Sequence, residues 1–219
     1  MSVQPLRHEA LDALGLEHGF GVRNAPARAD VARPVQVHGV AVARVDAAGT
    51  VVPEQADAIV TSRPRQCVGV ITADCVPILV ASESGRAVAA IHAGWRGLAA
   101  GVIECGLEAL AERAKGEAWT AVIGPHIRAC CYEVDEPVRS ALAQRFGESL
   151  VSQALEATRP EHGRIDLAQL ARYEVERLNS EAGRCLEVAG CTRCDADRFH
   201  SYRRDGAQAG RLLHFIAPS

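Results

Sequence analysis

The sequence predicts an α/β (α+β) fold in which a mixed β-sheet is flanked by helices in layers. Several short runs of apolar, mostly β-branched residues are typical of strands that are covered on both faces. Three longer segments instead repeat apolar residues every three or four positions, as the buried side of a helix does. Because the two kinds of segment are interspersed along the chain, we expect the helices to pack on the faces of the sheet.

The length and composition predict a single domain over residues 1–219. A chain of 219 residues, of which 48% are hydrophobic, can bury a large core without disulfide bonds. The loop-like segments are short, and apolar patterning resumes on both sides of each, so none is typical of a linker between domains. These segments span residues 23–34, 46–57 and 158–164.

The first predicted strand lies within residues 34–45, where valines alternate with other residues and Gly39 marks a bend or turn. The last apolar run, residues 211–217, could close the sheet at its carboxyl-terminal end. Continuous apolar runs between them predict central strands at residues 57–61, 67–73, 76–81, 87–93 and 120–124.

Each predicted helix has an apolar stripe, and two of the three have recognisable ends. Asp135 before Pro137 is a start signal for the second helix. Asp166 is the expected N-cap of the third helix, and Gly183 is its expected stop. The three helices are predicted at residues 98–114, 136–150 and 167–182.

Charge and aromatic content exclude several classes of partner. A formal charge of −3 gives no basic footprint for nucleic acid, and 4% aromatic residues give no base-stacking platform. No segment approaches the length of an apolar membrane helix, and the first residues do not resemble a signal peptide. We therefore expect a cytoplasmic protein that binds neither nucleic acid nor membranes and is a monomer or weak homo-oligomer.

The eight cysteines need an explanation other than disulfides, because cytosolic thiols stay reduced. Free cysteines commonly act as small buried apolar residues, and we expect this for most of them. Cys191 and Cys194 form a C-x2-C pair, but the adjacent Cys130 and Cys131 make a poor chelating partner for it. We therefore predict no structural zinc site there, and the sequence leaves open whether Cys191 and Cys194 oxidise.

Three short stretches place reactive side chains directly after apolar runs, which is how a sheet presents side chains in a crevice at its edge. They contain His38, Cys75 and His92, whose imidazole nitrogens and thiolate sulfur are donors that zinc accepts. Three protein ligands would leave a fourth position for water or substrate. The spacing alone also allows separate core or capping roles for each residue. The stretches are residues 36–39, 72–75 and 92–97.

The sequence has no glycine-rich phosphate loop, so a phosphate group would have to contact arginines and loop amides. Several arginines lie in stretches of unusual local chemistry, and a surface ion pair is the alternative for each. These arginines are Arg23, Arg96, Arg203 and Arg204. His126 stands near a strand end, where a lone histidine more often satisfies a backbone group, so we do not assign it to a site.

Motifs spread along the chain closely resemble the YfiH-like family: QVHG, TADCVPIL, HAGWRGLAAGV, CCYEV and FHSYRRDGAQAGR. Members of this family were first labelled multicopper polyphenol oxidases or laccase-domain proteins. They are now described as zinc-dependent purine nucleoside phosphorylases with adenosine deaminase activity. The resemblance covers nearly the whole chain and implies a single α/β domain. It also implies one zinc ion on His38, Cys75 and His92, with copper as a substitute on the same donors.

The resemblance also implies the reactions and the partners, which are a purine nucleoside and phosphate. The expected reactions are phosphorolysis of adenosine, inosine or methylthioadenosine to the base and ribose 1-phosphate, and hydrolytic deamination of adenosine. Cys75, Asp74 and Arg96 are then the catalytic candidates, and Asp57 is a second candidate acid. The candidates for binding substrate or phosphate are Arg23 and Arg203.

The chain departs from the family before the QVHG motif. Only a short segment joins Arg23 to Gln36, where family members carry a longer one. If the longer segment covers the nucleoside or the phosphate, we expect altered or weaker substrate binding here. The predicted metal ligands are unaffected by this difference.

Other functions stay open on the sequence alone. Cys75 and His92 could be the nucleophile and the base of a cysteine hydrolase or amidase. A copper-dependent polyphenol oxidase, or laccase, would need more histidines than the eight present. The last alternative is a non-enzymatic binding protein whose metal site no longer supports turnover.

Overall fold

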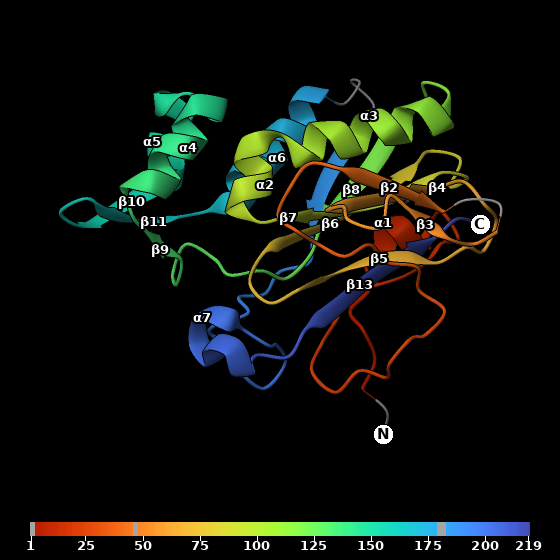
Figure 1. Ribbon diagram of the computed structural model, residues 1–219, viewed down its shortest axis with the longest axis horizontal. Coiled ribbons are helices and arrows are strands. Elements are labelled where there is room, and N and C mark those ends of the chain that lie inside the picture. The colour runs from red at the N-terminus through yellow and green to blue at the C-terminus, as the bar shows by residue number, and fades with distance from the viewer. Residues whose placement is uncertain (1–2, 46–47, 179–182) are drawn as a thin grey trace.

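The computed structural model describes residues 3–45, 48–178 and 183–219. Within these residues, seven strands form a mixed sheet at the centre of the molecule, as predicted (Figure 1). Their spatial order is β12 (Arg184–Glu187), β8 (Trp119–Ile123), β6 (Val76–Ser82), β7 (Val88–Ala93), β4 (Ala58–Thr61), β2 (Val42–Val45) and β3 (Val51–Val52). The β12–β8 and β2–β4 pairs are parallel, and the remaining neighbours are antiparallel.

The two faces of this sheet are covered by different layers. One face packs against the helices α3 (Val102–Ala114) and α6 (Leu167–Leu178) (Figure 1). The other packs against an antiparallel sheet of three described strands, in the order β1 (Glu17–Gly19), β13 (Leu212–Ala217) and β5 (Val68–Thr72). The largest apolar core lies between helices and sheet, and a second core lies between the two sheets.

The second sheet corrects one prediction. Residues 67–73 and 211–217 do not join the central sheet, because β5 and β13 pair with each other beneath it. Strands of two sheets that pack face to face can be as apolar as strands between two helix layers. A continuous apolar run therefore indicates burial but not sheet membership. The first predicted strand is also shorter than expected, since only β2 within residues 34–45 belongs to the sheet.

The predicted helices are present, but a glycine divides two of them. Gly101, at φ 97°, ends α2 (Trp95–Ala100) before α3 begins. Gly147, at φ 83°, likewise separates α4 (Glu136–Phe146) from α5 (Glu148–Ala154). A residue with positive φ interrupts a right-handed helix, and glycine adopts this conformation at the lowest cost.

Two predicted helix starts are confirmed. Asp135 is the N-cap of α4, and Pro137 lies in the first turn. The Asp166 carboxylate accepts a hydrogen bond from Ala168 N at 3.0 Å and so caps α6. The predicted last turn of that helix, residues 179–182, lies outside the described residues.

Some elements have no counterpart in the sequence prediction. A third antiparallel sheet of described strands has the order β10 (Leu155–Arg159), β11 (His162–Ile165) and β9 (Glu133–Val134), so part of the predicted loop 158–164 is a hairpin. The remaining described elements are α1 (Glu9–Asp12), α7 (Tyr202–Asp205) and a 3-10 turn at Gly206–Gln208. The described part of the chain contains no helix that is both long and apolar enough to cross a bilayer.

Candidate functional site

Strands of the central sheet end at one common edge, and this edge carries the predicted metal ligands. β6 and β7 are antiparallel, with Pro77 opposite His92. Cys75 immediately precedes β6 and therefore lies beside the end of β7 that carries His92. Asp57 immediately precedes β4, and its carbonyl oxygen accepts a hydrogen bond from His92 N at 2.7 Å. The strand register thus brings together residues that are far apart in the sequence.

His38, Cys75 and His92 form one cluster. A ligand atom of each residue lies within 4.8 Å of the other two, and the imidazole rings are 4.9 Å apart, edge to face at 75°. Zinc binds nitrogen and sulfur at about 2.0–2.3 Å, so small side-chain rotations would bring these atoms into one coordination sphere. The cluster is therefore a potential metal-binding site.

The QVHG motif is a loop whose backbone is fixed from two sides. The Gln36 amide exchanges hydrogen bonds of 2.8 and 2.7 Å with the backbone of Ile71 on β5. On the other side, the Asp57 carboxylate accepts hydrogen bonds of 2.7–3.1 Å from the backbone N–H groups of Val37, His38 and Gly39. These contacts hold His38 at φ 60°, a left-handed conformation that residues other than glycine rarely adopt.

Asp57 also orients His92. Its Oδ1 lies 2.8 Å from Nδ1 of His92, and its side chain is fully buried. Burial would raise the pKa of Asp57, but hydrogen bonds from His92 and from the loop amides hold that pKa below its usual range. An ionised Asp57 keeps a proton on Nδ1, so a metal would bind His92 through Nε2, as carboxylates arrange for metal-binding histidines elsewhere.

Cys75 has the ionisation that a metal ligand requires. Burial would raise the pKa of its thiol, but hydrogen bonds with His38 and His92 lower that pKa to about 7. A thiol with this pKa is substantially thiolate at neutral pH, the form that binds metals. Imidazole and thiolate donors suit zinc or copper rather than magnesium or calcium. The residues therefore fit the metal that the family resemblance implies.

Gly94 leaves the space in which these ligands approach one another. A Cβ at this position would lie 2.9 Å from Cδ2 of His38 and 3.1 Å from Sγ of Cys75. Its φ of −71° suits any residue, so the lack of space is what favours glycine here. We expect Gly94→Ala to weaken metal binding about 10- to 100-fold, the range for changes in the surroundings of metal ligands. Competition with a chelator of known affinity measures this, circular dichroism checks the fold, and an unchanged affinity would contradict the prediction.

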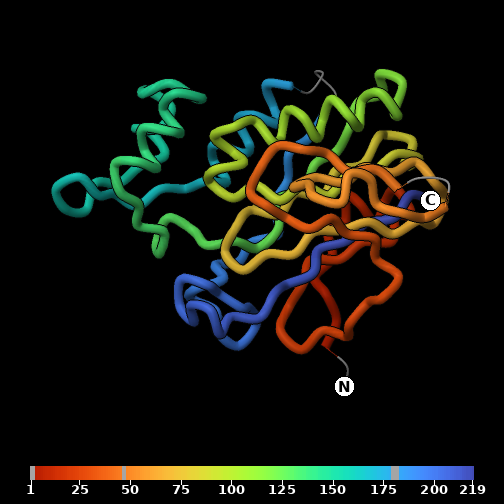
Figure 2. Tube along the Cα trace, in the orientation of Figure 1, coloured from red at the N-terminus to blue at the C-terminus, as the bar shows by residue number. Residues whose placement is uncertain are grey.

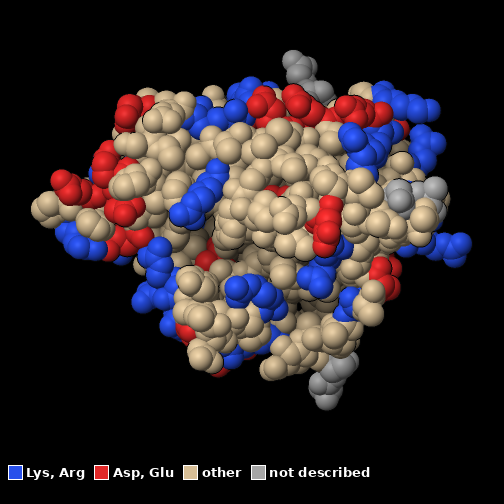
Figure 3. Space-filling model, in the orientation of Figure 1, with Lys and Arg blue, Asp and Glu red and all other residues tan. Residues whose placement is uncertain are grey.

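A cavity of about 830 Å³ is lined by all three cluster residues and is large enough for a nucleoside. Figure 3, in the orientation of Figure 1, shows a hollow near the centre of the visible face of the molecule, with basic side chains around it. Among the described lining residues there is a single carboxylate, Asp74, so the cavity favours anions. The arginines that line it are Arg33, Arg96, Arg203 and Arg211.

Two of the candidate anion-binding residues, Arg96 and Arg203, line the cavity. Each guanidinium lies over an aromatic ring, that of Arg96 4.3 Å from the Trp95 centroid and that of Arg203 5.0 Å from the Tyr132 centroid. Arg96 is exposed and makes no ion pair with any other described residue. Its charge is therefore available to a bound anion.

Arg23 and Arg204 do not line the cavity. Arg23 donates to the Phe199 carbonyl oxygen at 3.1 Å and to the Asp205 carboxylate at 3.3 Å. Arg204 also binds Asp205, and it donates to the Thr192 carbonyl oxygen at 2.9 Å. Both arginines thus fix the segment around α7, and neither lies at the cluster of His38, Cys75 and His92.

Asp74 links the start of β6 to the carboxyl-terminal segment. Its Oδ1 accepts a hydrogen bond from Thr192 Oγ1 and its Oδ2 accepts one from Arg203 N, each at 2.6 Å. It is buried and adopts a φ of 97°. Because both carboxylate oxygens are engaged in this way, Asp74 fixes the position of Arg203 at the cavity wall.

Arg33 and Arg211 also line the cavity, although neither was predicted to belong to the site. Arg211 ends the FHSYRRDGAQAGR motif and immediately precedes an apolar strand, which is a usable signal. Arg33 lies in a loop with no recognisable pattern. Since most of residues 31–36 contribute to the lining, the short segment before the QVHG motif forms part of the cavity wall.

Comparison with known proteins shows which family the chain resembles. The family model described as multi-copper polyphenol oxidoreductase laccase matches residues 20–219. The chain is 40% identical over 181 residues to a Xylella fastidiosa protein named purine nucleoside phosphorylase, covering 81% of this chain and 68% of that protein. It is 35% identical over 170 residues to the Escherichia coli protein named purine nucleoside phosphorylase YfiH, covering 74% and 64%.

Solved structures agree with this relationship. The crystal structure of Neisseria meningitidis protein NMB0706 is 36% identical with a TM-score of 0.74, over 86% of this chain and 75% of that one. The Bacillus licheniformis hypothetical protein YfiH has a TM-score of 0.84 over 99% and 97% of the two chains, and its 22% identity indicates a shared fold alone. From the family-model match, the identity to named relatives and the shared fold, we conclude that the chain belongs to the YfiH-like, laccase-domain family.

Proposed function

We propose that this protein is a zinc-dependent purine nucleoside phosphorylase. It uses phosphate to cleave adenosine, inosine or methylthioadenosine to the base and ribose 1-phosphate. The names of two relatives support the reaction. The observation that carries the proposal is a cluster of two histidines and one cysteine inside an arginine-lined cavity. We place the protein in the cytoplasm, where thiol ligands stay reduced.

The arginines supply the proposed phosphate subsite. Guanidinium groups bind phosphate through paired, charge-assisted hydrogen bonds. Arg96 is exposed and free of ion pairs with other described residues, so it is able to move onto a bound phosphate. Arg203 is held at the wall by Asp74, which accepts a hydrogen bond from its backbone N–H. Together they hold the phosphate near the anomeric carbon of the sugar.

The remaining lining residues suit the nucleoside and its leaving base. Trp95, Tyr132 and Tyr202 offer flat apolar surfaces against which a purine can pack. His38, Cys75 and His92 would hold the zinc ion, which would supply Lewis-acid chemistry to an oxygen or nitrogen of the substrate. Asp57 holds His92 in the orientation that this task requires.

A nucleoside assay combined with metal analysis tests the proposal. We expect the purified protein to contain zinc and to release adenine from adenosine only when phosphate is present. Removal of zinc should abolish this release, and added zinc should restore it. Base release that does not depend on phosphate, or no turnover by zinc-loaded protein, would contradict the proposal.

The Arg96→Ala variant tests the phosphate subsite. Hydrogen bonds to charged groups contribute about 1.5–3 kcal/mol, so we expect the KM for phosphate to rise roughly 10- to 150-fold. The KM for the nucleoside should change much less. Arg44→Ala is the control, because Arg44 pairs with Glu112 and does not line the cavity. Equal increases in both KM values would remove Arg96 from the phosphate subsite.

We also propose that the same cavity deaminates adenosine to inosine. Both reactions bind the same nucleoside, and deamination needs water delivered to C6 of the purine and a group that moves protons. Asp74 supports this activity as the described carboxylate that lines the cavity. We expect inosine to form from adenosine without phosphate. If no inosine forms under conditions that support phosphorolysis, the protein has the first activity alone.

A cysteine hydrolase is the second candidate function, and one observation favours it. Cys75 hydrogen-bonds to His92, whose Nδ1 lies 2.8 Å from Asp57, in the order of nucleophile, base and orienting carboxylate. A thiolate bound to zinc has a lone pair engaged by the metal, so the roles of ligand and nucleophile largely exclude each other. Iodoacetamide labelling therefore separates the two functions. Protection of Cys75 by stoichiometric zinc favours the phosphorylase, and rapid labelling of metal-loaded protein favours the hydrolase.

A copper-dependent polyphenol oxidase has less support from the molecule. Multicopper oxidases hold several copper ions on histidine-rich sites. Among the described residues, His38, Cys75 and His92 form the only cluster of metal-type donors that includes a histidine. One such cluster does not provide the set of copper sites that this chemistry uses.

A further inference from the structure

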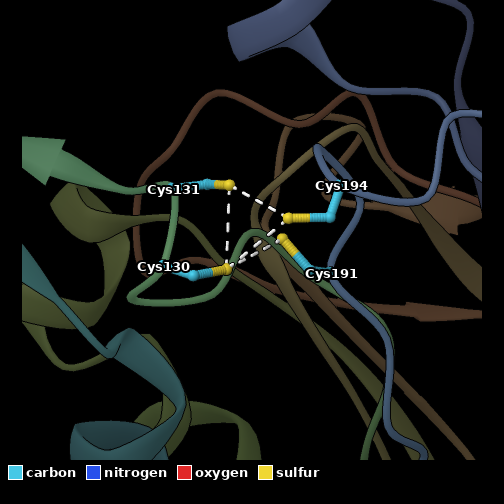
Figure 4. Close-up of side chains that lie close together, drawn as sticks. All are labelled: Cys130, Cys131, Cys191 and Cys194. Carbon is cyan, nitrogen blue, oxygen red and sulfur yellow. Dashed lines mark hydrogen bonds between the residues drawn. The ribbon is translucent and has the colours of Figure 1, made fainter.

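Four cysteine thiols converge at a second place, outside the cavity. Cys130 and Cys131 lie in the segment after β8, and Cys191 and Cys194 lie in the segment before α7. Figure 2 shows these segments, green and blue, approaching each other in space. Figure 4 shows the four sulfur atoms pointing toward one another. All four lie within 4.8 Å of each other.

The spacing of the sulfur atoms matches a tetrahedral site for one metal ion. The Sγ atom of Cys130 is 3.7 Å from the Sγ atoms of Cys131, Cys191 and Cys194, and Cys131 and Cys194 are 3.3 Å apart. Zinc bound to four thiolates at about 2.3 Å sets its sulfur atoms about 3.8 Å apart. A disulfide requires about 2.05 Å, and all eight cysteines, which lie within the described residues, are free thiols.

The backbone builds each half of this cluster as a tight turn. Between Cys191 and Cys194 the chain reverses, with Asp195 N donating to the Cys191 carbonyl oxygen at 3.1 Å. The backbone N–H groups of Arg128, Arg193 and Cys194 approach the Cys191 sulfur. Amide N–H groups near a sulfur stabilise a bound thiolate, since they offset its negative charge. The backbone around Cys191 and Cys194 therefore has the tight turn that a metal-binding C-x2-C pair requires.

The adjacent pair is positioned by its own turn and by a bridge between the two segments. Cys131 N donates to the Arg128 carbonyl oxygen at 2.9 Å, which closes the turn that carries Cys130 and Cys131. His126 and Cys191 form an isolated parallel bridge, which fixes the two segments side by side. The sequence predicted that adjacent cysteines would make a poor chelating pair, whereas the sulfur atoms of Cys130 and Cys131 both lie within 4.8 Å of those of Cys191 and Cys194.

We propose that Cys130, Cys131, Cys191 and Cys194 bind a second zinc ion with a structural role. Four thiolates in tetrahedral positions close the coordination sphere, which leaves no open position for catalysis. Separations of 3.3–3.7 Å suit one ion, whereas an iron–sulfur cluster would hold its thiolates further apart. Arg193 donates from Nη1 to the Cys131 sulfur at 3.5 Å and offsets part of the site's negative charge.

This second zinc ion would fix the positions of two residues of the cavity wall, Tyr132 and Asp74. Tyr132 follows Cys131 directly and lines the cavity. Thr192 lies between Cys191 and Cys194, and its hydroxyl donates to the lining residue Asp74 at 2.6 Å. The proposed ion therefore fixes residues on both sides of the cavity without touching a substrate. Its role does not depend on which reaction the cavity supports.

Zinc counting in purified protein and variants tests the proposal. We expect a Cys191→Ala/Cys194→Ala variant to contain one zinc ion fewer per chain than the wild-type protein. A His38→Ala/His92→Ala variant should lose the cavity metal and keep this one, so the two sites fail independently. Cys105→Ala is the matched control and should lose neither, because the Cys105 thiol lies on α3 in neither donor cluster of the described residues.

A second measurement keeps the test valid if the double variant does not fold. The wild-type protein is titrated with an organomercurial while zinc release is recorded. We expect zinc to be released as the four thiols react, and cobalt substitution to give the strong charge-transfer absorption of several thiolate ligands. Equal zinc content in wild type and folded double variant, iron in place of zinc, or disulfides among these cysteines in freshly purified protein would each overturn the proposal.

Discussion

Replacing Cys75 by alanine is expected to remove the cavity metal and to lower kcat/KM for phosphorolysis at least about 100-fold, because Lewis-acid stabilisation of several kcal/mol is lost. Cys75 contributes the thiolate of the cluster, and its sulfur lies within 4.8 Å of a ring nitrogen of His38 and one of His92. Zinc content and kcat/KM are measured on the same preparation.

The control for this variant is Cys105→Ala, which removes a thiol from α3 and should leave both quantities unchanged. Circular dichroism should show that the Cys75→Ala protein stays folded, since the central sheet does not depend on this side chain. If the variant loses its metal and keeps full phosphorolysis, the metal has no part in the reaction.

Replacing Asp57 by asparagine is expected to weaken zinc binding about 10- to 100-fold, as loss of a carboxylate partner to a metal-binding histidine does. The neutral amide has a single acceptor oxygen, so its NH2 group faces either His92 and His38 N or the N–H groups of Val37 and Gly39 instead of accepting from them. It also lacks the negative charge that holds the proton of His92 on Nδ1. Because Asp57 is fully buried, leaving these donors unpaired should also reduce the free energy of unfolding by about 1–3 kcal/mol.

Asp166→Ala separates the two effects of the Asp57 change. It removes the cap of α6 and should lower stability by about 0.5–2 kcal/mol, comparable to the loss expected for Asp57→Asn. Its zinc affinity should stay at the wild-type value. Should Asp166→Ala weaken zinc binding as much as Asp57→Asn does, general destabilisation would explain both results and Asp57 would have no special role.

The candidate metal-binding cluster could be predicted from the sequence because strand ends and metal chemistry both leave local signals. His38, Cys75 and His92 each follow an apolar run, and their donor atoms suit the same ions. Strand register, which the sequence does not show, explains why they meet: β6 and β7 place Cys75 beside His92. The class of fold was predictable for the same reason, since apolar runs and helical stripes are local patterns.

The parts that could not be predicted depend on which elements pair in three dimensions. β5 and β13 are as apolar as the central strands, so burial alone did not reveal that they form a separate sheet. The contribution of Cys130 and Cys131 to a thiol cluster depends on a turn that brings both sulfur atoms to the same side. The hydrogen bonds of the Asp74 carboxylate could not be predicted, because its two partners, Thr192 and Arg203, are more than a hundred residues away in the sequence.

Diffraction data collected at the zinc absorption edge from crystals of the purified protein test the central claim most directly. We expect an anomalous peak about 2.0–2.3 Å from Nε2 of His92, an imidazole nitrogen of His38 and Sγ of Cys75, with one coordination position open to the cavity. No peak at these atoms in crystals of active protein would show that the proposed chemistry does not use them.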